Sequence, residues 1–124
     1  LNDGFACAKL GAMYLRGLEV KQDSLKAAEL FKKSCDLYYG FGCAALASMY
    51  QKAEGIPKDN SKTAEFFRRA CDLNHGVGCA GLGAMYQAGI GGLPQDDFKA
   101  SEFYKKACEL KVEVGCTQYA KLNP

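Results

Sequence analysis

The chain has 124 residues, which is the length of one ordinary domain. Hydrophobic residues make up 48% of it, enough for a packed core, and this composition excludes a disordered chain. The formal net charge of +2 argues against a nucleic-acid partner, and no apolar run reaches the roughly 18 residues that a membrane span needs.

The sequence repeats itself in steps of 36 residues. Glycine recurs at 4, 40 and 76, and a Met-Tyr pair recurs at 13–14, 49–50 and 85–86. From Glu65 to Glu102 the step is 37, and the extra residue fits in the loop 89–94. A period of this size is typical of a solenoid, in which no unit can bury its apolar face alone. We therefore expect a single repeat domain over 1–124, with units at 4–39, 40–75 and 76–112 and a terminal half-unit at 113–124.

Each unit is predicted to contain two helices. The first spans 4–16, 40–53, 76–88 and 113–122 in successive units, and the second spans 24–38, 61–73 and 97–110. In the third unit Cys79, Leu82 and Tyr86 fall on one face of such a helix. Glycine inside a helix costs about 1 kcal/mol relative to alanine. Three such glycines therefore predict places where another helix packs closely: Gly11, Gly81 and Gly83.

The ends of the predicted helices carry their own signals. An aspartate precedes each second helix, at positions 23, 59 and 96, where its carboxylate can cap the helix N-terminus. We expect the first helix to end at Gly17, at Gly89 or around 54–55. The second should end at Gly40 or Gly76, because glycine readily takes the left-handed conformation past a helix. Glu113 stands in place of that glycine at the third joint, which predicts a looser or shifted turn there.

Seven cysteines are many for a chain of this length, and six of them form three C-x7-C pairs. Each pair brackets the turn between two units. Antiparallel helices joined by a short turn can supply the roughly 5.5–6 Å Cα separation of a disulfide. We therefore expect the bonds Cys35–Cys43, Cys71–Cys79 and Cys108–Cys116. Cys7 is expected to pair with a cysteine before Leu1, so the chain is interpreted either as part of a longer precursor or as a piece that lacks its upstream helix.

Regularly spaced cysteines indicate disulfides and an oxidising compartment, so we expect a secreted or periplasmic protein. The alternative is zinc, but structural zinc sites use closely spaced C-x2-4-C pairs or Cys/His mixtures, and the only histidine is His75. No metal and no cofactor are expected. His75 is interpreted as an exposed turn residue without an acid–base partner, and Cys7 as half of a disulfide rather than a reactive thiol.

Basic pairs recur on the second helices at 32–33, 68–69 and 105–106. One reading is a ridge for an anionic ligand. Each of these residues also has an acidic residue four positions away, as in Glu29–Lys33 and Lys32–Asp36, so we expect intrahelical ion pairs on a solvated face. Aromatic residues that recur with the period are expected in the core: Phe31, Phe67, Phe103, Tyr14, Tyr50 and Tyr86.

Residues that differ between units at equivalent places on the first helices are better binding candidates, because a shared scaffold does not dictate them. In solenoids the inner helices usually line the concave surface. Lys9, Arg16 and Lys52 are therefore the groove residues that the sequence predicts.

Residues 26–37 (KAAELFKKSCDL) and 76–86 (GVGCAGLGAMY), together with the C-x7-C joints, resemble the SEL-one-like repeat family, and most closely the Helicobacter cysteine-rich proteins. The resemblance covers essentially the whole chain. It implies an all-α, right-handed superhelix of disulfide-locked helix pairs that is secreted or periplasmic. It also implies penicillin binding, slow β-lactamase activity and contact with peptidoglycan fragments or host cells.

No catalytic motif accompanies the resemblance. No serine has a lysine three residues later, Lys62-Thr63-Ala64 is not K-T-G, and a metal-dependent lactamase needs several histidines. The predicted function is a binding module for a peptide, a protein or a cell-wall fragment, with β-lactams as further ligands. The alternative is slow hydrolysis of penicillin or cephalosporin derivatives, and a third hypothesis is a structural adaptor in an envelope assembly. Neither nucleic acid nor a membrane span is expected.

Overall fold

The computed structural model describes residues 3–124, and seven α-helices make up the regular structure of that range. One helix of each unit is inner: α1 (Gly4–Arg16), α3 (Gly40–Lys52), α5 (Gly76–Ala88) and α7 (Glu113–Leu122). The others are outer: α2 (Ser24–Asp36), α4 (Asn60–Asp72) and α6 (Asp97–Glu109). Every predicted helix is present, with ends that lie within two residues of those expected. The all-α solenoid of helix pairs is confirmed.

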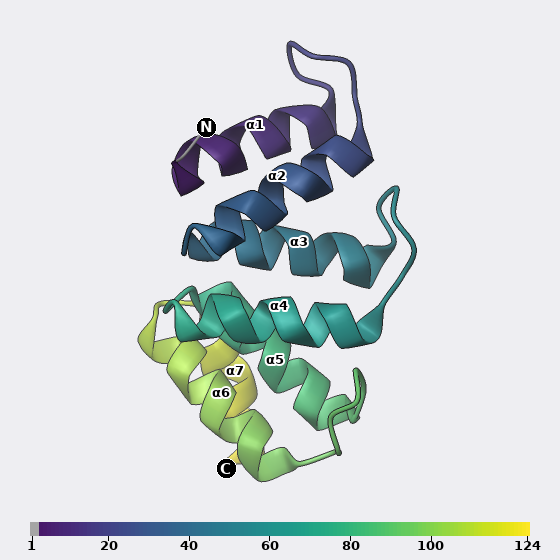
Figure 1. The fold of residues 1–124 in the computed structure, drawn as a ribbon. Coiled ribbons are helices and arrows are strands. Elements are labelled where there is room, and N and C mark those ends of the chain that lie inside the picture. Colours follow the sequence, from purple (N-terminus) through teal and green to yellow (C-terminus); the bar gives the residue numbers. More distant parts are fainter. Residues whose placement is uncertain (1–2) are drawn as a thin grey trace.

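Successive helices stack along one direction, with α1 near one end and α6 and α7 near the other (Figure 1). The long loops all lie at one edge of the stack, and the short joints α2–α3, α4–α5 and α6–α7 lie at the opposite edge. Each helix packs against the next, and α1 also contacts α3, as α3 contacts α5. The inner helices therefore form a continuous layer. None of the helices in the described range could cross a membrane.

Aspartate caps begin the outer helices, as predicted. The carboxylates of Asp23, Asp59 and Asp96 each accept a 3.0 Å hydrogen bond from a backbone N–H three residues on. Two inner helices end as expected at a left-handed glycine, Gly17 and Gly89, both with φ of 69°. In α3 an alanine, Ala53, takes this conformation with φ of 54°.

The glycines predicted to end the outer helices, Gly40 and Gly76, do not take the left-handed conformation. The left-handed residue of each joint lies earlier in the turn, at Tyr38 (φ 64°), Asn74 (φ 60°) and Lys111 (φ 70°). Gly40 and Gly76 are instead the first residues of α3 and α5. The prediction of a left-handed glycine at these places is therefore wrong.

Close packing between the two ends of a unit explains the two glycines instead. A Cβ on Gly40 would lie 2.8 Å from Cβ of His75, and one on Gly76 would lie 2.5 Å from Cγ2 of Val112. Each glycine thus packs against the last residue of its own unit, which leads into the next inner helix. The third joint keeps the same turn geometry, with Lys111 left-handed and Val112 before α7, so Glu113 does not loosen it.

Aromatic residues fill the layer between inner and outer helices, with corrections to the predicted core. Tyr86 is buried as expected, whereas Tyr14 and Tyr50 are only partly buried against the core. Phe31 and Phe67 are buried as expected, but in the third unit their position belongs to Tyr104, which is 3% exposed. Phe103 is only partly buried and stacks on Tyr86 with ring centroids 5.5 Å apart. The 37-residue step accounts for this, because it moves the third outer helix by one residue. The close contacts predicted at Gly11, Gly81 and Gly83 are present, against the rings of Phe31, Phe67 and Tyr104.

Basic residues of the outer helices mostly reach across units. Of the predicted intrahelical ion pairs, only Lys32–Asp36 forms in the described range, with Nζ 2.8 Å from Oδ2. Arg69 reaches back to Asp36 of the preceding unit at 2.9 Å, and Lys106 Nζ donates to the carbonyl of Cys71 at 3.1 Å. Both acceptors lie at the C-terminus of the preceding outer helix, the end that attracts cations. The prediction of intrahelical pairing is wrong for the remaining residues.

Candidate binding surface

Disulfides tie each outer helix to the next inner helix. The structure joins Cys35 to Cys43, Cys71 to Cys79 and Cys108 to Cys116, with Cα–Cα distances of 4.6, 4.6 and 4.5 Å. Cys7 is fully buried and unpaired among the described residues. Its pairing with an upstream cysteine stays a prediction, and its burial gives it no access to a substrate.

The first joint carries an additional tie. The hydroxyl of Ser34, which is fully buried, donates a 2.7 Å hydrogen bond to the carbonyl of Gly4. A Cβ on Gly4 would lie 2.7 Å from Cβ of Tyr39, the residue that precedes α3. The start of α1, the end of α2 and the start of α3 are therefore held as one rigid corner.

Each inner helix carries one stripe of residues that are exposed or only partly buried. In α1 the stripe is Phe5, Lys9, Ala12 and Arg16, which follow one helical face. The equivalent positions are Phe41, Ala45, Ser48 and Lys52 in α3, Val77, Gly81, Ala84 and Ala88 in α5, and Val114, Gln118 and Lys121 in α7. We call these residues the inner face.

The inner face is apolar at one edge and basic at the other. Its first-turn residues are large, hydrophobic and exposed by 45 to 58%: Phe5, Phe41, Val77 and Val114. The predicted groove residues Arg16 and Lys52 lie exposed in the last turns of α1 and α3. Four positions of the inner face are basic and none is acidic. Unpartnered apolar area of this kind marks an interaction surface.

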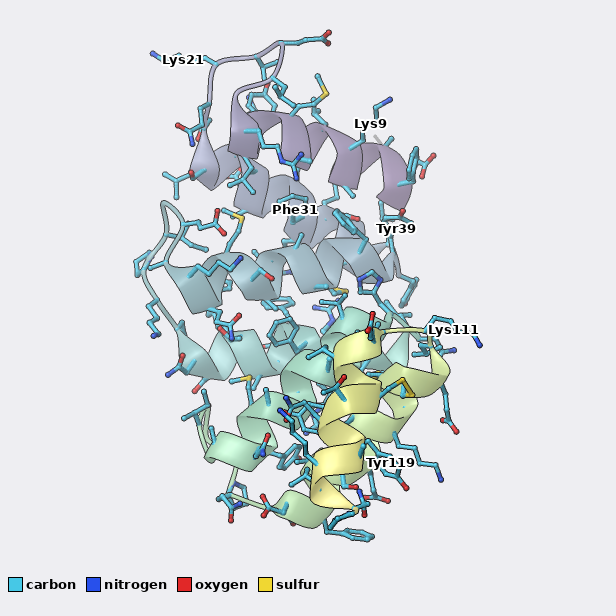
Figure 2. The ribbon with its side chains drawn as sticks, turned by 180° about the vertical axis from the view of Figure 1, so that it is seen from behind. Lys9, Lys21, Phe31, Tyr39, Lys111 and Tyr119 are labelled. Atoms are coloured by element: carbon cyan, nitrogen blue, oxygen red, sulfur yellow. A yellow bond between two sulfur atoms is a disulfide. The ribbon has the colours of Figure 1, made fainter. Side chains whose placement is uncertain are left out.

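A pocket of about 380 Å³ lies between α1 and α3. Its lining combines three aromatic rings with small side chains and a single charge, from Phe5, Ala8, Lys9, Ala12, Tyr39 and Phe41. The ring of Phe5 meets that of Tyr39 edge-on with centroids 5.9 Å apart, and Tyr39 lies 6.4 Å from Phe41. Figure 2 shows Lys9 and Tyr39 on the same edge of the molecule. The structure thus places the predicted groove residue Lys9 in this lining.

A second pocket of about 380 Å³ lies between α5 and α7. It reuses the same positions of a later unit, with Val77 in place of Phe5, Gly81 in place of Lys9 and Ala84 in place of Ala12. No charged residue lines it. Tyr104 closes one side, with its hydroxyl donating to Oε1 of Gln87 at 2.9 Å, and burial raises the pKa of this phenol. The two pockets therefore use equivalent positions of the inner helices, but the first contains a charge and several aromatic rings and the second has no charge.

A third hollow of about 540 Å³ lies between α6 and α7 and contains no predicted site residue. It holds charges of both signs on its outer-helix wall, among them Glu102 and Lys105. Its one hydroxyl on that wall, Ser101 Oγ, accepts a 2.6 Å hydrogen bond from Nδ2 of Asn123. The hydrogen-bond partner of this serine is thus an amide, which cannot act as a base.

His75 is not the exposed turn residue that we expected. It is half-buried as the residue before α5, and its ring meets that of Phe41 edge-on with centroids 6.1 Å apart. Burial lowers the pKa of this imidazole. Its role is to continue a row of rings from Tyr39 through Phe41 along the joint edge. Within residues 3–124, no group of three or more His, Cys, Asp or Glu side chains could hold a metal ion.

Sequence reasoning missed this row of rings because it looked for aromatics that recur with the period. Tyr39, His75 and Val112 are equivalent joint residues, as are Phe5, Phe41 and Val77 one turn later. Their change from aromatic to aliphatic along the chain hides them from a periodicity test. The signal that could have found them is an aromatic residue just before or after the glycines that start α1 and α3, Gly4 and Gly40.

Solved structures of similar shape come from three bacteria. The chain superposes on a Sel1 repeat protein of Oxalobacter formigenes with a TM-score of 0.88 and 26% identity, covering 97% of this chain and 90% of that one. A protective antigen of uropathogenic Escherichia coli with an SLR fold gives 0.87 and 29% identity, over 93% of this chain and 24% of that one. Cysteine-rich protein B of Helicobacter pylori gives 0.76 and 30% identity, over 92% and 87%.

No curated protein matches the chain closely enough to count as a relative. The family model for the Sel1 repeat matches residues 4–39, 40–75 and 76–112. These matches take in three helix pairs with their joints, so the match and the superpositions describe the same architecture. The chain belongs to the Sel1 repeat family.

Proposed function

We propose that the chain is a binding module that holds a peptide or a segment of another protein on its inner face. Sel1 repeats generally mediate protein interactions. The observation that carries the proposal is the composition of the inner face, which has exposed apolar first turns, no acidic side chain and basic residues that form no ion pair within residues 3–124. Such a surface favours a partner with apolar and acidic side chains.

The inner face has small side chains between its larger ones, and this favours a peptide over a folded protein surface as the ligand. Ala12, Ala84 and Gly81 leave room along the layer of inner helices, and two pockets open there. A shallow row of such pockets suits side chains that project from one extended or helical segment. Disulfides at each joint keep the row in shape, which lowers the entropy cost of binding.

We also propose that the module works outside the cytoplasm, either secreted or in a periplasm. Three disulfides at regular joints support this, because such bonds persist in oxidising compartments. The intact mass of the protein purified without reductant tests the pairing. Disulfide mapping should return the three joint pairs, whereas six free thiols at these positions would remove the argument for secretion.

Selection from a random peptide library on the immobilised chain tests the binding proposal. Enriched peptides should carry acidic and apolar residues and lose affinity for Ala12→Gln and Ala84→Gln, which fill the two pockets with a neutral side chain. The matched control is Ser61→Gln on the exposed side of α4, which should bind as the unmodified chain does. Peptides that bind all four proteins equally would contradict the inner-face assignment.

Cell-wall fragments and β-lactams enter the same experiment as competitors. Penicillin binding and slow β-lactamase activity rest on family resemblance, and the inner-face pockets offer no hydroxyl other than tyrosine to act as a nucleophile. Displacement of a selected peptide by a muropeptide would move the ligand class to cell-wall fragments. Displacement by benzylpenicillin without turnover would make the drug a ligand of the same face.

A further inference from the structure

We propose that the pocket between α1 and α3 is an anchor for a peptide that places an aromatic or branched aliphatic side chain next to a carboxylate. This inference rests on the proposed function, because it assumes that the inner face is the binding face. It goes further by assigning one pocket, one kind of side chain and one charge. Three properties of the pocket carry it, namely its rings, its single cation and its rigid frame.

The rings set the shape of the occupant. Phe5 stands edge-on to Tyr39, with an interplanar angle of 81°, and Tyr39 is tilted by 52° against Phe41. Aromatic pairs prefer edge-on or offset contacts, and three rings at such angles leave faces and edges open to a further ring. The small Ala8 and Ala12 form the floor. At about 380 Å³ the pocket lies in the range of small-ligand sites, large enough for one aromatic side chain with its flanking backbone.

The cation sets the charge of the occupant. Lys9 is the only charged residue in the lining, and it forms no ion pair with any residue of the described range. An ammonium at an apolar wall attracts a carboxylate more strongly than one in open water. Further along the same face, Arg16 and Lys52 repeat the positive sign. The pocket therefore favours an anionic group beside the apolar side chain.

The frame keeps the pocket open before a ligand arrives. Tyr39 is fixed at its backbone, where its N–H donates to the carbonyl of Ser34 at 3.1 Å and its carbonyl accepts from Gly42 at 3.0 Å. Beside it, the Cys35–Cys43 disulfide joins α2 to α3. Phe5, although 58% exposed, is held against Tyr39 by the close packing of Gly4. Because these side chains are already held in place, their ordering costs little entropy when a ligand binds.

The equivalent pocket between α5 and α7 supplies an internal comparison. Valines stand at the positions of Phe5 and Phe41, and Gly81 stands at the position of Lys9. This pocket suits an aliphatic side chain without an acidic neighbour. The inner face thus has two unlike ends, and a peptide that satisfies both must lie in one direction along it.

The test is a titration of the isotope-labelled chain with short synthetic peptides, followed by two-dimensional amide NMR. All peptides have the same Gly/Ser frame, are acetylated and amidated, and differ only in a central pair: Phe-Asp, Phe-Asn, Phe-Lys or Gly-Asp. An additional peptide ends in Phe with a free C-terminal carboxylate. Comparing this peptide with the Phe-Asp peptide shows whether Lys9 prefers a side-chain carboxylate or a C-terminal one.

We expect the Phe-Asp peptide to shift amide signals of the first turns of α1 and α3. Phe-Asn should bind about three-fold more weakly, as an exposed ion pair allows, and Gly-Asp about ten-fold more weakly. Lys9→Gln should abolish the difference between Phe-Asp and Phe-Asn. The matched control Lys21→Gln removes an equal charge from the loop at the far end of α1 and should preserve it (Figure 2). Phe5→Ala should weaken every Phe peptide, while Phe98→Ala, which removes an exposed ring from the outer helix α6, should leave them unchanged.

Three outcomes overturn the anchor. The first is equal affinity for Phe-Asp and Phe-Lys, and the second is an unchanged preference in Lys9→Gln. The third is a set of shifts confined to α5 and α7, which removes the α1–α3 pocket but leaves inner-face binding intact. Shifts confined to the outer helices instead contradict the proposed function itself. The two failures are therefore distinguishable in one data set.

Discussion

The hydroxyl of Ser34 donates a 2.7 Å hydrogen bond to the carbonyl oxygen of Gly4, which lies 30 residues earlier in the chain. This contact joins the end of α2 to the start of α1, at the corner where the Cys35–Cys43 disulfide joins α2 to α3. The other two joints have alanine at the position of Ser34, namely Ala70 and Ala107. The first corner, beside the aromatic pocket, is therefore the most heavily tied of the three.

Replacing Ser34 with alanine should lower the free energy of unfolding by about 0.5–1.5 kcal/mol, the usual net contribution of one hydrogen bond. The other joints show that alanine fits this position, so no cavity adds to the loss. Urea unfolding followed by far-UV circular dichroism measures the change. Ser61→Ala, at an exposed site on α4, is the control and should shift the free energy by less than about 0.5 kcal/mol. An unchanged midpoint in Ser34→Ala would show that water replaces the bond.

Gly78→Ala should be among the most destabilising single changes, at about 2 kcal/mol or more. A Cβ there would lie 2.8 Å from both the backbone nitrogen of Cys71 and the carbonyl oxygen of Phe67, and backbone cannot step aside as a side chain can. The comparison variant is Gly92→Ala, where a Cβ meets nothing within 4 Å and only the positive φ of 81° resists it, at a cost of about 1 kcal/mol. Equal losses in the two variants would refute close packing at the second joint.

Removing the middle disulfide by Cys71→Ala together with Cys79→Ala should cost about 2–3 kcal/mol, as the loop-entropy model gives for a short ring. Calorimetry under identical oxidising conditions measures the loss. The double variant should remain helical, because the neighbouring bonds at the first and third joints persist. If reductant lowers the melting temperature of the unmodified chain no more than it lowers that of the double variant, the middle bond contributes nothing.

His75 should make stability depend on pH below neutrality. Burial lowers the pKa of its imidazole from the ordinary value of 6.5 in the folded chain, so the unfolded chain takes up a proton more readily. The free energy of unfolding is therefore greatest above pH 6.5 and falls as the pH drops toward the folded-state pKa. Urea midpoints at about pH 7.5 and pH 5 measure the fall, and His75→Gln should reduce it. The opposite sign, greater stability at the lower pH, would contradict burial as the cause.

Features that depend on residues close together in the chain, such as helix caps and helix ends, could be predicted from the sequence. The caps at Asp23 and Asp96 and the glycine ends of α1 and α5 each depend on one turn of backbone, and all lie where expected. The 36-residue period also predicted the helix pairs correctly. Repetition tells which residues share an environment, and the pairing of cysteines at the joints follows from local geometry once the helices are known.

Contacts between residues far apart in the chain could not be predicted in this way. Gly40 was assigned a local role in ending a helix, but it is required by its close contact with Cβ of His75, which lies 35 residues later at the far end of the same unit. Arg69 has acidic neighbours on its own helix, yet it pairs with Asp36 of the preceding unit. In the third unit a one-residue change in the step decided whether Phe103 or Tyr104 is buried. Each case depends on how segments far apart in the chain pack together, which a pattern along one chain does not record.

Lys9 illustrates the same limit at the candidate site. Its variation between units marked it as a groove residue, and the structure places it in the lining of a pocket. The rings beside it come from two units, with Phe5 in the first and Phe41 in the second. No position-by-position comparison of the units brings those residues together.

The glycines that start α1, α3 and α5 set how closely neighbouring segments of the stack approach one another. The residues that pack on Gly4 and Gly40, Tyr39 and His75, also form the edge of the inner face. The spacing thus depends on a residue without a side chain, whereas the residue opposite differs between units, with tyrosine at 39, histidine at 75 and valine at 112. If the inner face binds as proposed, substitutions at these three positions should alter ligand preference more than helix stacking. Because each unit has its own glycine and its own facing residue, such a sequence can change the facing residue in one unit without changing the others.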